Sequence, residues 1–541
     1  MTSKVIIFGI DAGSLKLIKQ WQHELPNFKQ IIENGAFGEL ESTVPALTCP
    51  AWPCIFTGKN PGKLGMYDFL NLRFYTEDAF RVFNSTDYHS ASLWKILNDY
   101  GKEVGLLNIP VTFPTHKIDS FMVSGVGTPQ SERTNYTYPP TLKKTLDEIV
   151  GGYVITPSVM LTLCGKEREY LKLFEETLGK RVKAARYLMN NFTWDLFVCV
   201  FFILDTVQHY FWHHLDKNHP KHNKSSGYKD VIKDFYKRVD EAIGTLISEI
   251  PKDANILIVS DHGPGPAYGE FSINQWLEDS GFLKFRKVVH KERVDTALRR
   301  VRDFMLPRLA PRLVRFIARL TPPWLARKLY TLDEWKDRMM ETISDIDWPR
   351  TRAYGLGMTG GIFINLKGRE PNGIVKPGKE YETLRDEIIK QLSQVVDPQS
   401  GKPAGFIAFR REEIYHGEYA ELAPDITVTS DKYSLVNTRG ASQWGDSAIT
   451  GAHSQYGLFM AYGPAIRKSG IELNNLKVYD IAPTVLHMFG LPIPADTDGR
   501  VLAEIFADDS EPANRLVVYE ERSERKRLKE RVSQLKISGK I

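Results

Sequence analysis

A short run of branched apolar residues, Ile256 to Val259, ends abruptly in the polar segment Ser260-Asp261-His262-Gly263. Because both odd and even positions of the run are apolar, it is typical of a strand buried on both faces of a sheet. Open α/β sheets carry their functional residues just beyond the carboxyl ends of such strands. Asp261 and His262 stand there side by side, and both residue types ligate metal ions. The alternative is an ordinary strand-to-loop junction, so a metal site depends on partners elsewhere in the chain.

Strands and helices alternate along most of the chain. Strands are expected at residues 5–10, 38–43, 104–108, 196–204, 256–259, 362–366, 423–428 and 457–461. Helices are expected at residues 15–34, 92–100, 142–150, 166–191, 229–249, 381–396 and 478–489. This alternation predicts an α/β fold with a largely parallel, doubly wound sheet. On the long helix 229–249 we expect Asp234 and Asp240 to face solvent.

Nothing in the sequence indicates secretion or a membrane span. The chain enters a strand at Lys4 to Ile10 without the charged, apolar and small-residue regions of a signal peptide. No apolar run approaches the ~20 residues that a spanning helix needs. The cysteines form no Cys-x-x-Cys pair, which suits reduced thiols in a reducing compartment; they are Cys49, Cys54, Cys164 and Cys199. We therefore expect a soluble, cytoplasmic protein.

Positive charge is concentrated in one segment. Lys284 to Lys328 contains fourteen Lys or Arg and three acidic residues, a local charge of +11, although the whole chain carries only +5. Apolar residues recur there at helical spacing, so we predict a basic helical insertion over residues 282–345. It is either a solvated helical cap, or a cover over an anionic substrate, or a contact with an anionic membrane surface. Aromatic residues are not interleaved in it as nucleic-acid stacking requires, and we expect no nucleic-acid partner.

Polar residues gather mostly at the ends of predicted strands. Three Asp and three His form the set: Asp11, Asp205, His209, Asp261, His262 and His453. Asp205 and His209 are four residues apart, so on a helix they share one face and can reach one ion. Mixed carboxylate and imidazole ligands suit borderline cations, Zn²⁺ first and Mn²⁺ as the alternative. Six such ligands and a nucleophile would serve two ions with an open position for substrate.

Thr48 is the candidate nucleophile. It precedes Pro50 and Trp52 at the start of a predicted helix. A threonine hydroxyl is a weak nucleophile at neutral pH, but contact with a metal ion lowers its pKa and makes attack on phosphorus feasible. The same turn would direct backbone N–H groups at a phosphate. A threonine that only caps this helix is the alternative interpretation.

The order of these residues resembles the alkaline phosphatase superfamily. The resemblance is to its type I phosphodiesterase/nucleotide pyrophosphatase branch and the related microbial phosphohydrolase or phosphomutase proteins, and it covers roughly residues 1–505. Similar stretches are Pro50-Ala51-Trp52, Asn60-Pro61-Gly62-Lys63, Val207-Gln208-His209, Ser260-Asp261-His262-Gly263 and Tyr479-Asp480-Ile481-Ala482-Pro483-Thr484. It implies an alkaline-phosphatase-like fold and a phosphoester hydrolase whose Thr48 forms a phospho-threonine.

The resemblance also implies which residues hold which ion. Asp205, His209 and His453 would hold one, and Asp11, Asp261, His262 and the Thr48 oxygen would hold the other. The expected substrate is a small anionic phosphoester such as a nucleotide, a nucleotide-sugar or a phospholipid-like molecule. We predict a catalytic domain of residues 1–281 and 346–507, interrupted by the basic insertion 282–345 and followed by a charged tail, residues 508–541.

Two positions depart from known relatives. In the better-known nucleotide pyrophosphatases an asparagine twenty-one residues after the nucleophile holds a phosphate oxygen. Phe69 occupies that position here, and Asn71 and Asn108 are the candidates to replace it. Sulfatases of the superfamily carry Cys-x-Pro-x-Arg at the nucleophile. The stretch Thr48 to Trp52 lacks the arginine, so we expect no sulfatase chemistry and interpret Cys49 as a packing residue.

Other interpretations remain open at this point. A phosphomutase acting on a sugar phosphate would use the same phospho-threonine but return the phosphoryl group to its substrate. An inactive protein that binds membranes or anionic polymers through the basic insertion is the alternative from a different class. A further histidine group follows His209, and we interpret it as a polar helix end rather than as metal ligands: His213, His214, His219 and His222.

Overall fold

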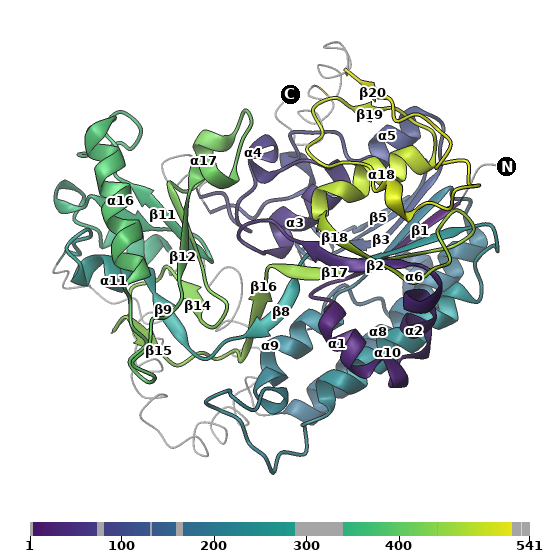
Figure 1. Cartoon of the computed structure of the whole chain (residues 1–541), viewed down its shortest axis with the longest axis horizontal. Coiled ribbons are helices and arrows are strands. Elements are labelled where there is room, and N and C mark those ends of the chain that lie inside the picture. The colour runs from purple at the N-terminus through teal and green to yellow at the C-terminus, as the bar shows by residue number, and fades with distance from the viewer. Residues whose placement is uncertain are drawn as a thin grey trace.

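The computed structural model describes residues 4–72, 80–129, 133–157, 166–286, 339–440 and 442–521, together with Val532. Within these residues the largest element is a nine-stranded sheet, in the order β18-β2-β17-β7-β1-β6-β3-β4-β5 (Figure 1). Its middle is parallel and consists of β7 (Asn255–Val259), β1 (Val5–Ile10), β6 (Leu196–Phe201), β3 (Val104–Ile109) and β4 (Ser120–Ser124). Antiparallel pairs occur toward the edges, which hold β17 (Tyr456–Tyr462), β2 (Ala36–Glu41), β18 (Ile471–Lys477) and β5 (Thr137–Tyr138).

Helices cover both faces of this sheet (Figure 1). Side chains of β1 alternate between the two faces, so Ile6 and Phe8 enter one hydrophobic core and Val5 and Ile7 enter the other. The first core receives α1 (Leu15–Trp21), α2 (Pro26–Asn34), α6 (Leu142–Val150), α8 (Glu167–Asn191), α9 (Ile203–Leu215) and α10 (Val231–Ile247). The second receives α3 (Thr48–Thr57), α5 (Leu93–Asp99) and α18 (Ile481–Met488). The predicted doubly wound α/β fold is confirmed.

A smaller lobe lies at the left of Figure 1 and has its own hydrophobic core. Its sheet runs in the order β10 (Ala353–Gly355), β11 (Gly360–Ile364), β13 (Ile426–Thr429) and β12 (Ile407–Arg410), and α11 (Ile273–Asp279) and α16 (Lys379–Ser393) belong to the same lobe. All pairs in this sheet are antiparallel, whereas the strands predicted at residues 362–366 and 423–428 were expected in a largely parallel sheet. The turn between β10 and β11 is too short for the crossover that a parallel pair needs. The division into a catalytic domain (1–281 and 346–507), an insertion (282–345) and a tail (508–541) remains a prediction.

A two-stranded ribbon leads from the large sheet toward the smaller lobe. It pairs β8 (Gly263–Pro266) with β16 (Gly451–Ser454) in antiparallel register. Next to it, β9 (Glu270–Ser272) lies between β14 (Ser434–Val436) and β15 (Trp444–Gly445). Short elements complete the described chain: α4 (Pro61–Leu64), α17 (Arg411–Ile414), β19 (Ile493–Pro494) and β20 (Tyr519–Glu520). The ribbon matters for the site because β8 directly follows His262 and β16 contains His453.

Most predicted boundaries shift by a few residues, and two of the differences change the type or the number of elements. The strand predicted at residues 196–204 ends at Phe201, and α9 begins at Ile203, so Asp205 lies in the first turn of a helix and not at a strand end. The helix predicted at residues 15–34 is two helices separated by a 3₁₀ turn at Gln22–Glu24. Pro26 explains this break, because it has no N–H to donate within a continuing helix but is well suited to the first turn of a new one.

Asp240 is buried on α10, so the prediction that it faces solvent is wrong. Its carboxylate accepts hydrogen bonds from the backbone N–H groups of Asn27 at 3.2 Å and Phe28 at 2.7 Å. These groups belong to the first turn of α2, whose N-terminal N–H groups have no partner within the helix. Asp240 therefore caps α2 from a neighbouring helix. Asp234 is exposed, as predicted, and Cys49 is buried in the core, as its interpretation as a packing residue requires.

Part of the predicted basic insertion and of the charged tail lies outside the described residues. The missing ranges are 287–338 of the insertion, and 522–531 and 533–541 of the tail; Cys164 falls in another, 158–165. At the described ends of the insertion, Phe285 and Ile346 pair in an antiparallel bridge. In the part of the chain that the structure describes, no helix combines the length and apolarity needed to cross a membrane.

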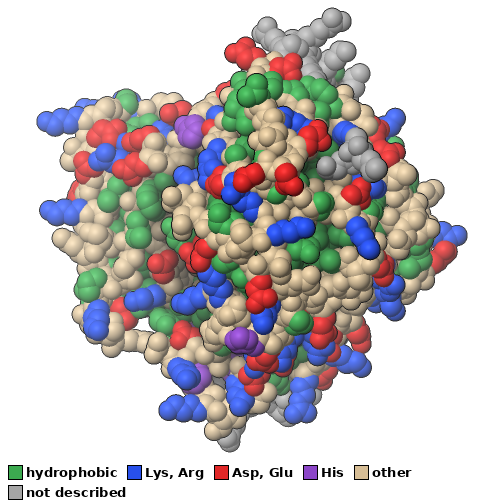
Figure 2. All heavy atoms as spheres, turned by 45° about the vertical axis from the view of Figure 1, so that its right-hand side comes forward, with side chains coloured by type: hydrophobic (Ala, Val, Ile, Leu, Met, Phe, Trp, Pro, Cys, Tyr) green, Lys and Arg blue, Asp and Glu red, His purple; other side chains and the backbone are tan. Residues whose placement is uncertain are grey.

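Charged side chains of both signs are mixed on the surface. Figure 2 shows basic and acidic side chains interspersed over the face that it draws. On exposed helices many of them form pairs four residues apart, such as Lys144 with Glu148 at 3.8 Å. Such pairs contribute only a few tenths of a kcal/mol each, so they favour solubility more than stability.

Candidate functional site

The seven residues predicted for the site converge at the carboxyl edge of the large sheet. Asp11 follows β1, and Asp261 and His262 follow the adjacent parallel strand β7. Thr48 is the first residue of α3, Asp205 and His209 lie on α9, and His453 lies on the ribbon strand β16. Asp11, Asp261 and His262 have no exposed surface at all. Residues that are far apart in the sequence therefore form one buried polar cluster.

The inner part of the cluster consists of Asp11, Asp261, His262 and the Thr48 hydroxyl. Each of the first three offers a ligand atom, and these atoms lie within 4.8 Å of one another. His262 Nε2 lies 3.2 Å from Asp261 Oδ2 and 3.6 Å from Asp11 Oδ1. The same nitrogen lies 3.2 Å from Thr48 Oγ1. The threonine hydroxyl thus borders a group that could hold one cation.

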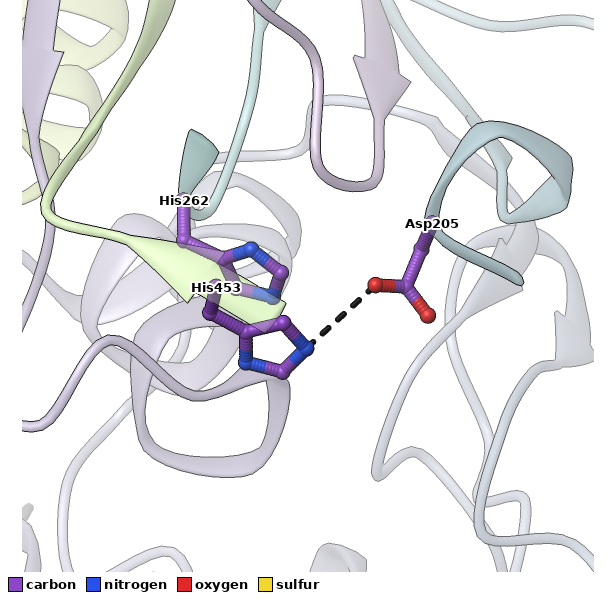
Figure 3. A group of neighbouring side chains, drawn as sticks. All are labelled: Asp205, His262 and His453. Carbon is purple, nitrogen blue, oxygen red and sulfur yellow. Dashed lines mark ion pairs between the residues drawn. The ribbon is translucent and has the colours of Figure 1, made fainter. Parts of the chain in front are cut away.

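The outer part contains Asp205, His209 and His453. Asp205 Oδ1 lies 3.2 Å from His209 Nε2 and 3.3 Å from His453 Nε2, and the two imidazole nitrogens are 3.1 Å apart. Figure 3 shows His453 pointing toward Asp205 with His262 beside it. The rings of His262 and His453 stack with their centroids 3.8 Å apart. A second ligand group within 4.8 Å comprises Asp205, His262 and His453, so the two parts are contiguous and meet at His262.

All three imidazoles are oriented in the same way by backbone carbonyls. Nδ1 donates to Gly451 O at 2.7 Å in His209, to Ala46 O at 2.9 Å in His453 and to Gly263 O at 3.2 Å in His262. A carbonyl oxygen can only accept, so Nδ1 carries the proton of each neutral ring. Nε2 is left with a lone pair that faces the carboxylates. This is the arrangement that metal-ligating histidines adopt.

Two buried carboxylate oxygens have no hydrogen-bond donor among the described residues, namely Asp11 Oδ1 and Asp261 Oδ2. The other oxygen of each carboxylate is bonded, Asp11 Oδ2 by Trp52 Nε1 at 2.9 Å and Asp261 Oδ1 by the Ala12 N–H at 3.3 Å. Burial, together with the charges of Asp261 and Asp205, raises the pKa of Asp11. Unpaired buried acceptors are costly. These oxygens therefore fit a divalent cation better than a hydrogen-bond network.

Thr48 does not cap its helix through its side chain. Leu47 occupies the N-cap position of α3, and no side chain caps the helix there. The Thr48 hydroxyl faces His262, and the residue is almost completely buried. The interpretation of Thr48 as a helix cap is therefore wrong. The uncapped first turn leaves backbone N–H groups of α3 next to the hydroxyl, which is a favourable position for an anion.

Two further residues support the site, and sequence reasoning gave them no role. Trp52 holds Asp11 through the bond just described. Gln208 lies between Asp205 and His209 on α9, and its Nε2 donates to Ala12 O at 2.9 Å. Ala12 has a φ of +53°, in the left-handed region that non-glycine residues rarely adopt. Trp52 lies in the stretch Pro50-Ala51-Trp52, and Gln208 lies in Val207-Gln208-His209. The similarity of these stretches to the related microbial proteins was the sequence signal that could have pointed to both residues.

The two asparagines proposed for substrate binding have different surroundings. Asn108 is the penultimate residue of β3, is fully buried with a φ of +64°, and donates from Nδ2 to Val200 O at 3.3 Å. Its Oδ1 has no donor among the described residues. Asn71 lies near a short antiparallel bridge, where its backbone N–H donates to Arg81 O at 2.8 Å. Phe69 packs against the core on the α3 side of the sheet.

The histidines that follow His209 form a polar helix end, as predicted. His213 Nδ1 lies 3.0 Å from Thr450 Oγ1, His219 Nε2 lies 3.0 Å from Ala267 O, and His222 Nδ1 lies 2.9 Å from His213 O. Burial and the neighbouring His214 lower the pKa of His213 to about 3. Neither metal-ligand group found among the described residues includes any of the four.

Comparison with known proteins gives one family match that spans most of the chain. The family model described as type I phosphodiesterase / nucleotide pyrophosphatase matches residues 5–454, a range that contains all seven site residues. None of the curated proteins compared with the chain matches it.

Similar solved structures include murine ectonucleotide pyrophosphatase/phosphodiesterase 5, in an inactive form in complex with AMP, at 12% identity and a TM-score of 0.47, covering 91% of this chain and 96% of that one. A second structure of the murine protein has 13% identity, a TM-score of 0.47 and the same coverage. The human protein has 12% identity and a TM-score of 0.46, covering 92% of this chain and 97% of that one. On the strength of the family match over residues 5–454, the chain belongs to the type I phosphodiesterase/nucleotide pyrophosphatase family of the alkaline phosphatase superfamily.

Proposed function

We propose that this protein hydrolyses phosphoesters by nucleophilic attack of Thr48, at a site that holds two divalent cations. One observation carries the proposal: the Thr48 hydroxyl lies 3.2 Å from His262 Nε2, beside two buried carboxylate oxygens that have no donor among the described residues. A hydroxyl placed next to unpaired anionic ligands is arranged for activation by a cation. Membership of a phosphodiesterase family supports the same chemistry.

The cation ligands divide between the two parts of the cluster. Asp11, Asp261 and His262 would hold one cation beside Thr48. Asp205, His209 and His453 would hold the other. Carboxylates with imidazoles suit Zn²⁺, and Mn²⁺ is the alternative. When bound, the cations supply positive charge that favours the deprotonated threonine and offsets the charge on the phosphate oxygens.

Thr48 carries the covalent step. Its hydroxyl loses its proton to solvent, Oγ1 forms a bond to phosphorus, and the ester P–O bond breaks as the leaving oxygen takes a proton from solvent. A water molecule then attacks the phospho-threonine, which releases the phosphate product and restores the hydroxyl. The uncapped N-terminus of α3 would hold a phosphate oxygen through backbone N–H groups during both steps.

The proposed substrate is a small anionic phosphoester, with a nucleotide as the first candidate because of the family. Phe69 removes the amide that better-known relatives use on a phosphate oxygen, so recognition must differ. Asn71 and Asn108 are proposed as substrate-binding residues. Nδ2 of Asn108 is engaged with Val200 O, and its Oδ1 is an acceptor without a donor among the described residues, so Asn108 would accept from a hydroxyl of the substrate and would not take over the phosphate contact.

Metal analysis combined with turnover tests the proposal. Purified wild type should contain about two equivalents of Zn or Mn and cleave bis(p-nitrophenyl) phosphate faster than p-nitrophenyl phosphate. Thr48→Ala should keep its metal and lose at least a thousandfold in turnover, while Thr48→Ser should keep part of the activity. Unchanged turnover in Thr48→Ala would show that Thr48 is not the nucleophile. Transfer of phosphate to an added sugar phosphate instead of water would identify a mutase.

A further inference from the structure

A second cavity, of about 750 Å³, lies apart from the seven site residues, none of which lines it. Segments distant in sequence form its walls: the loop after α9, the end of the β8–β16 ribbon, the loop after α16, and the residues around β14 and β15. Its volume falls in the range of about 300–1,000 Å³ that is typical of small-molecule sites. Aromatic and basic residues stand out among its lining: Lys221, Tyr268, Lys402, Lys432, Tyr433 and Trp444.

The aromatic walls of the cavity are held in place by their own contacts. Trp444 packs against Phe271 and Tyr433, with ring centroids 4.9 Å away in both cases. Tyr268 donates from its hydroxyl to Asp216 Oδ2 at 2.9 Å. Because these side chains are already ordered, binding a planar base or the C–H face of a sugar ring against them costs little side-chain entropy.

The charge left over in the cavity is positive. Lys221 pairs with Asp446 at 2.5 Å. Asp397 also lines the cavity and keeps its negative charge; its carboxylate accepts hydrogen bonds from the N–H of Gln399 at 3.0 Å, the N–H of Ser400 at 3.1 Å and the hydroxyl of Tyr433. The three lysines and two aspartates of the lining therefore sum to +1.

The two remaining lysines of the lining, Lys402 and Lys432, are exposed and have no side-chain partner within the described ranges. Two lysine ammonium groups without anionic partners favour a ligand that carries a phosphate.

We propose that this cavity binds a small phosphate monoester attached to a ring, either a nucleoside monophosphate or a sugar phosphate. The ring lies against Trp444, Tyr433 and Tyr268, and the phosphate lies between Lys402 and Lys432. The proposal is independent of Thr48 and of the metal ligands.

The cavity nevertheless borders both segments that lead to the outer ligands. Lys221 follows α9, which carries His209, and its Nζ donates to Ser447 O at 2.6 Å, just before β16 with His453. Through Lys221, the wall of the cavity is joined to the segments that lead to both histidines.

Calorimetry on protein stripped of metal by a chelator separates this site from the catalytic one, because phosphate binding at the latter depends on its cations. AMP, ribose 5-phosphate and inorganic phosphate are titrated in turn. We expect one equivalent of AMP or ribose 5-phosphate to bind. The double variant Lys402→Ala/Lys432→Ala should weaken that binding at least tenfold, whereas Lys390→Ala, an exposed lysine on α16, should not.

The three titrants distinguish the sources of the ligand. Tighter binding of AMP indicates a nucleotide, and equal binding of ribose 5-phosphate indicates a sugar phosphate. If inorganic phosphate binds as tightly as AMP and ribose 5-phosphate do, the aromatic walls contribute nothing to binding, and their proposed contact with the ring is wrong.

A second measurement uses metal-loaded protein, in case stripping disturbs the fold. AMP or ribose 5-phosphate should quench a component of tryptophan fluorescence that is missing in Trp444→Phe. Absence of saturable binding in the stripped protein, together with no Trp444-dependent quenching in the loaded protein, overturns the proposal. Ester hydrolysis would be unaffected by that result, so the two proposals fail separately.

Discussion

Gln208 donates from Nε2 to the Ala12 carbonyl at 2.9 Å and thereby joins helix α9 to the loop after β1. Gln208 lies between Asp205 and His209, and Ala12 follows Asp11. The oxygen of the same amide is bonded as well. Gln208 Oε1 accepts from the Tyr236 hydroxyl at 3.2 Å, and this hydroxyl accepts from the Ser14 N–H at 3.0 Å. One buried amide therefore couples the supports of the inner and the outer ligand groups.

Gln208→Leu should weaken metal binding in both groups. The substitution leaves the Ala12 carbonyl and the Tyr236 hydroxyl buried without this partner, which costs about 1–3 kcal/mol of unfolding free energy. Metal content after dialysis and urea unfolding of the same samples measure both effects. Gln30→Leu, at an exposed position on α2, is the control and should change neither. Full metal retention in Gln208→Leu would show that the two groups are held independently.

His453→Ala should remove about one of two metal equivalents. His453 Nε2 completes the outer group with Asp205 and His209, while its Nδ1 is already engaged by Ala46. His213→Ala is the matched control, because His213 contacts Thr450 in the same region but belongs to neither ligand group of the described residues. Elemental analysis of both variants decides the prediction. Equal metal loss in the two would mean that the effect is structural.

Asp68 should make stability depend on pH. Burial raises the pKa of Asp68 to about 6, although Oδ2 accepts from the Met358 N–H and Oδ1 from the Leu70 N–H. Between the unfolded value of about 4 and pH 6, the native state binds more protons than the unfolded state. Stability therefore falls as pH rises through this window, by about 3 kcal/mol in total.

Asp68→Asn tests this dependence, because an amide cannot ionise. Its unfolding free energy relative to wild type should rise by up to about 3 kcal/mol between about pH 4 and pH 7, as measured by urea unfolding at several pH values. Asp234→Asn, at an exposed position, should show the same unfolding free energy as wild type at each pH. A difference between Asp68→Asn and wild type that does not change with pH would mean that folding does not raise the pKa of Asp68.

Asp240→Ala should destabilise the fold by about 1–3 kcal/mol. The substitution removes the acceptor for the N–H groups of Asn27 and Phe28 and uncaps α2. Asp234→Ala, on the exposed face of the same helix, should stay within about 0.5 kcal/mol of wild type. Thermal unfolding of the pair measures the difference. Similar melting temperatures for both variants would contradict the capping role.

Asp205 and His209 illustrate what local spacing can predict. Their separation of four residues indicated a shared helical face, and the structure places both side chains within reach of one point. The strand before them was predicted three residues too long, because Phe202, Ile203 and Leu204 continue the apolar run into α9. Apolar character alone does not distinguish a buried strand from the first turn of a buried helix.

Asp240 and Gln208 illustrate what spacing cannot predict. Both are polar residues on amphipathic helices, where solvent exposure is the usual outcome. Their partners, Phe28 and Ala12, are 212 and 196 residues away in the chain. Only the packing of α10 against α2, and of α9 against the β1 loop, makes them buried and bonded.

The sequence by itself determined the α/β class, the strand ends at Asp11 and Asp261, and the types of residue gathered there, because local periodicity encodes which side chains are buried. The tertiary structure decided the rest. It brings His453 to the site on an antiparallel ribbon, stacks it on His262, and turns the Thr48 hydroxyl toward His262 instead of its own helix. It also leaves Asp11 Oδ1 and Asp261 Oδ2 without a donor among the described residues. These relationships depend on long-range strand pairing and burial, and no local pattern encodes them.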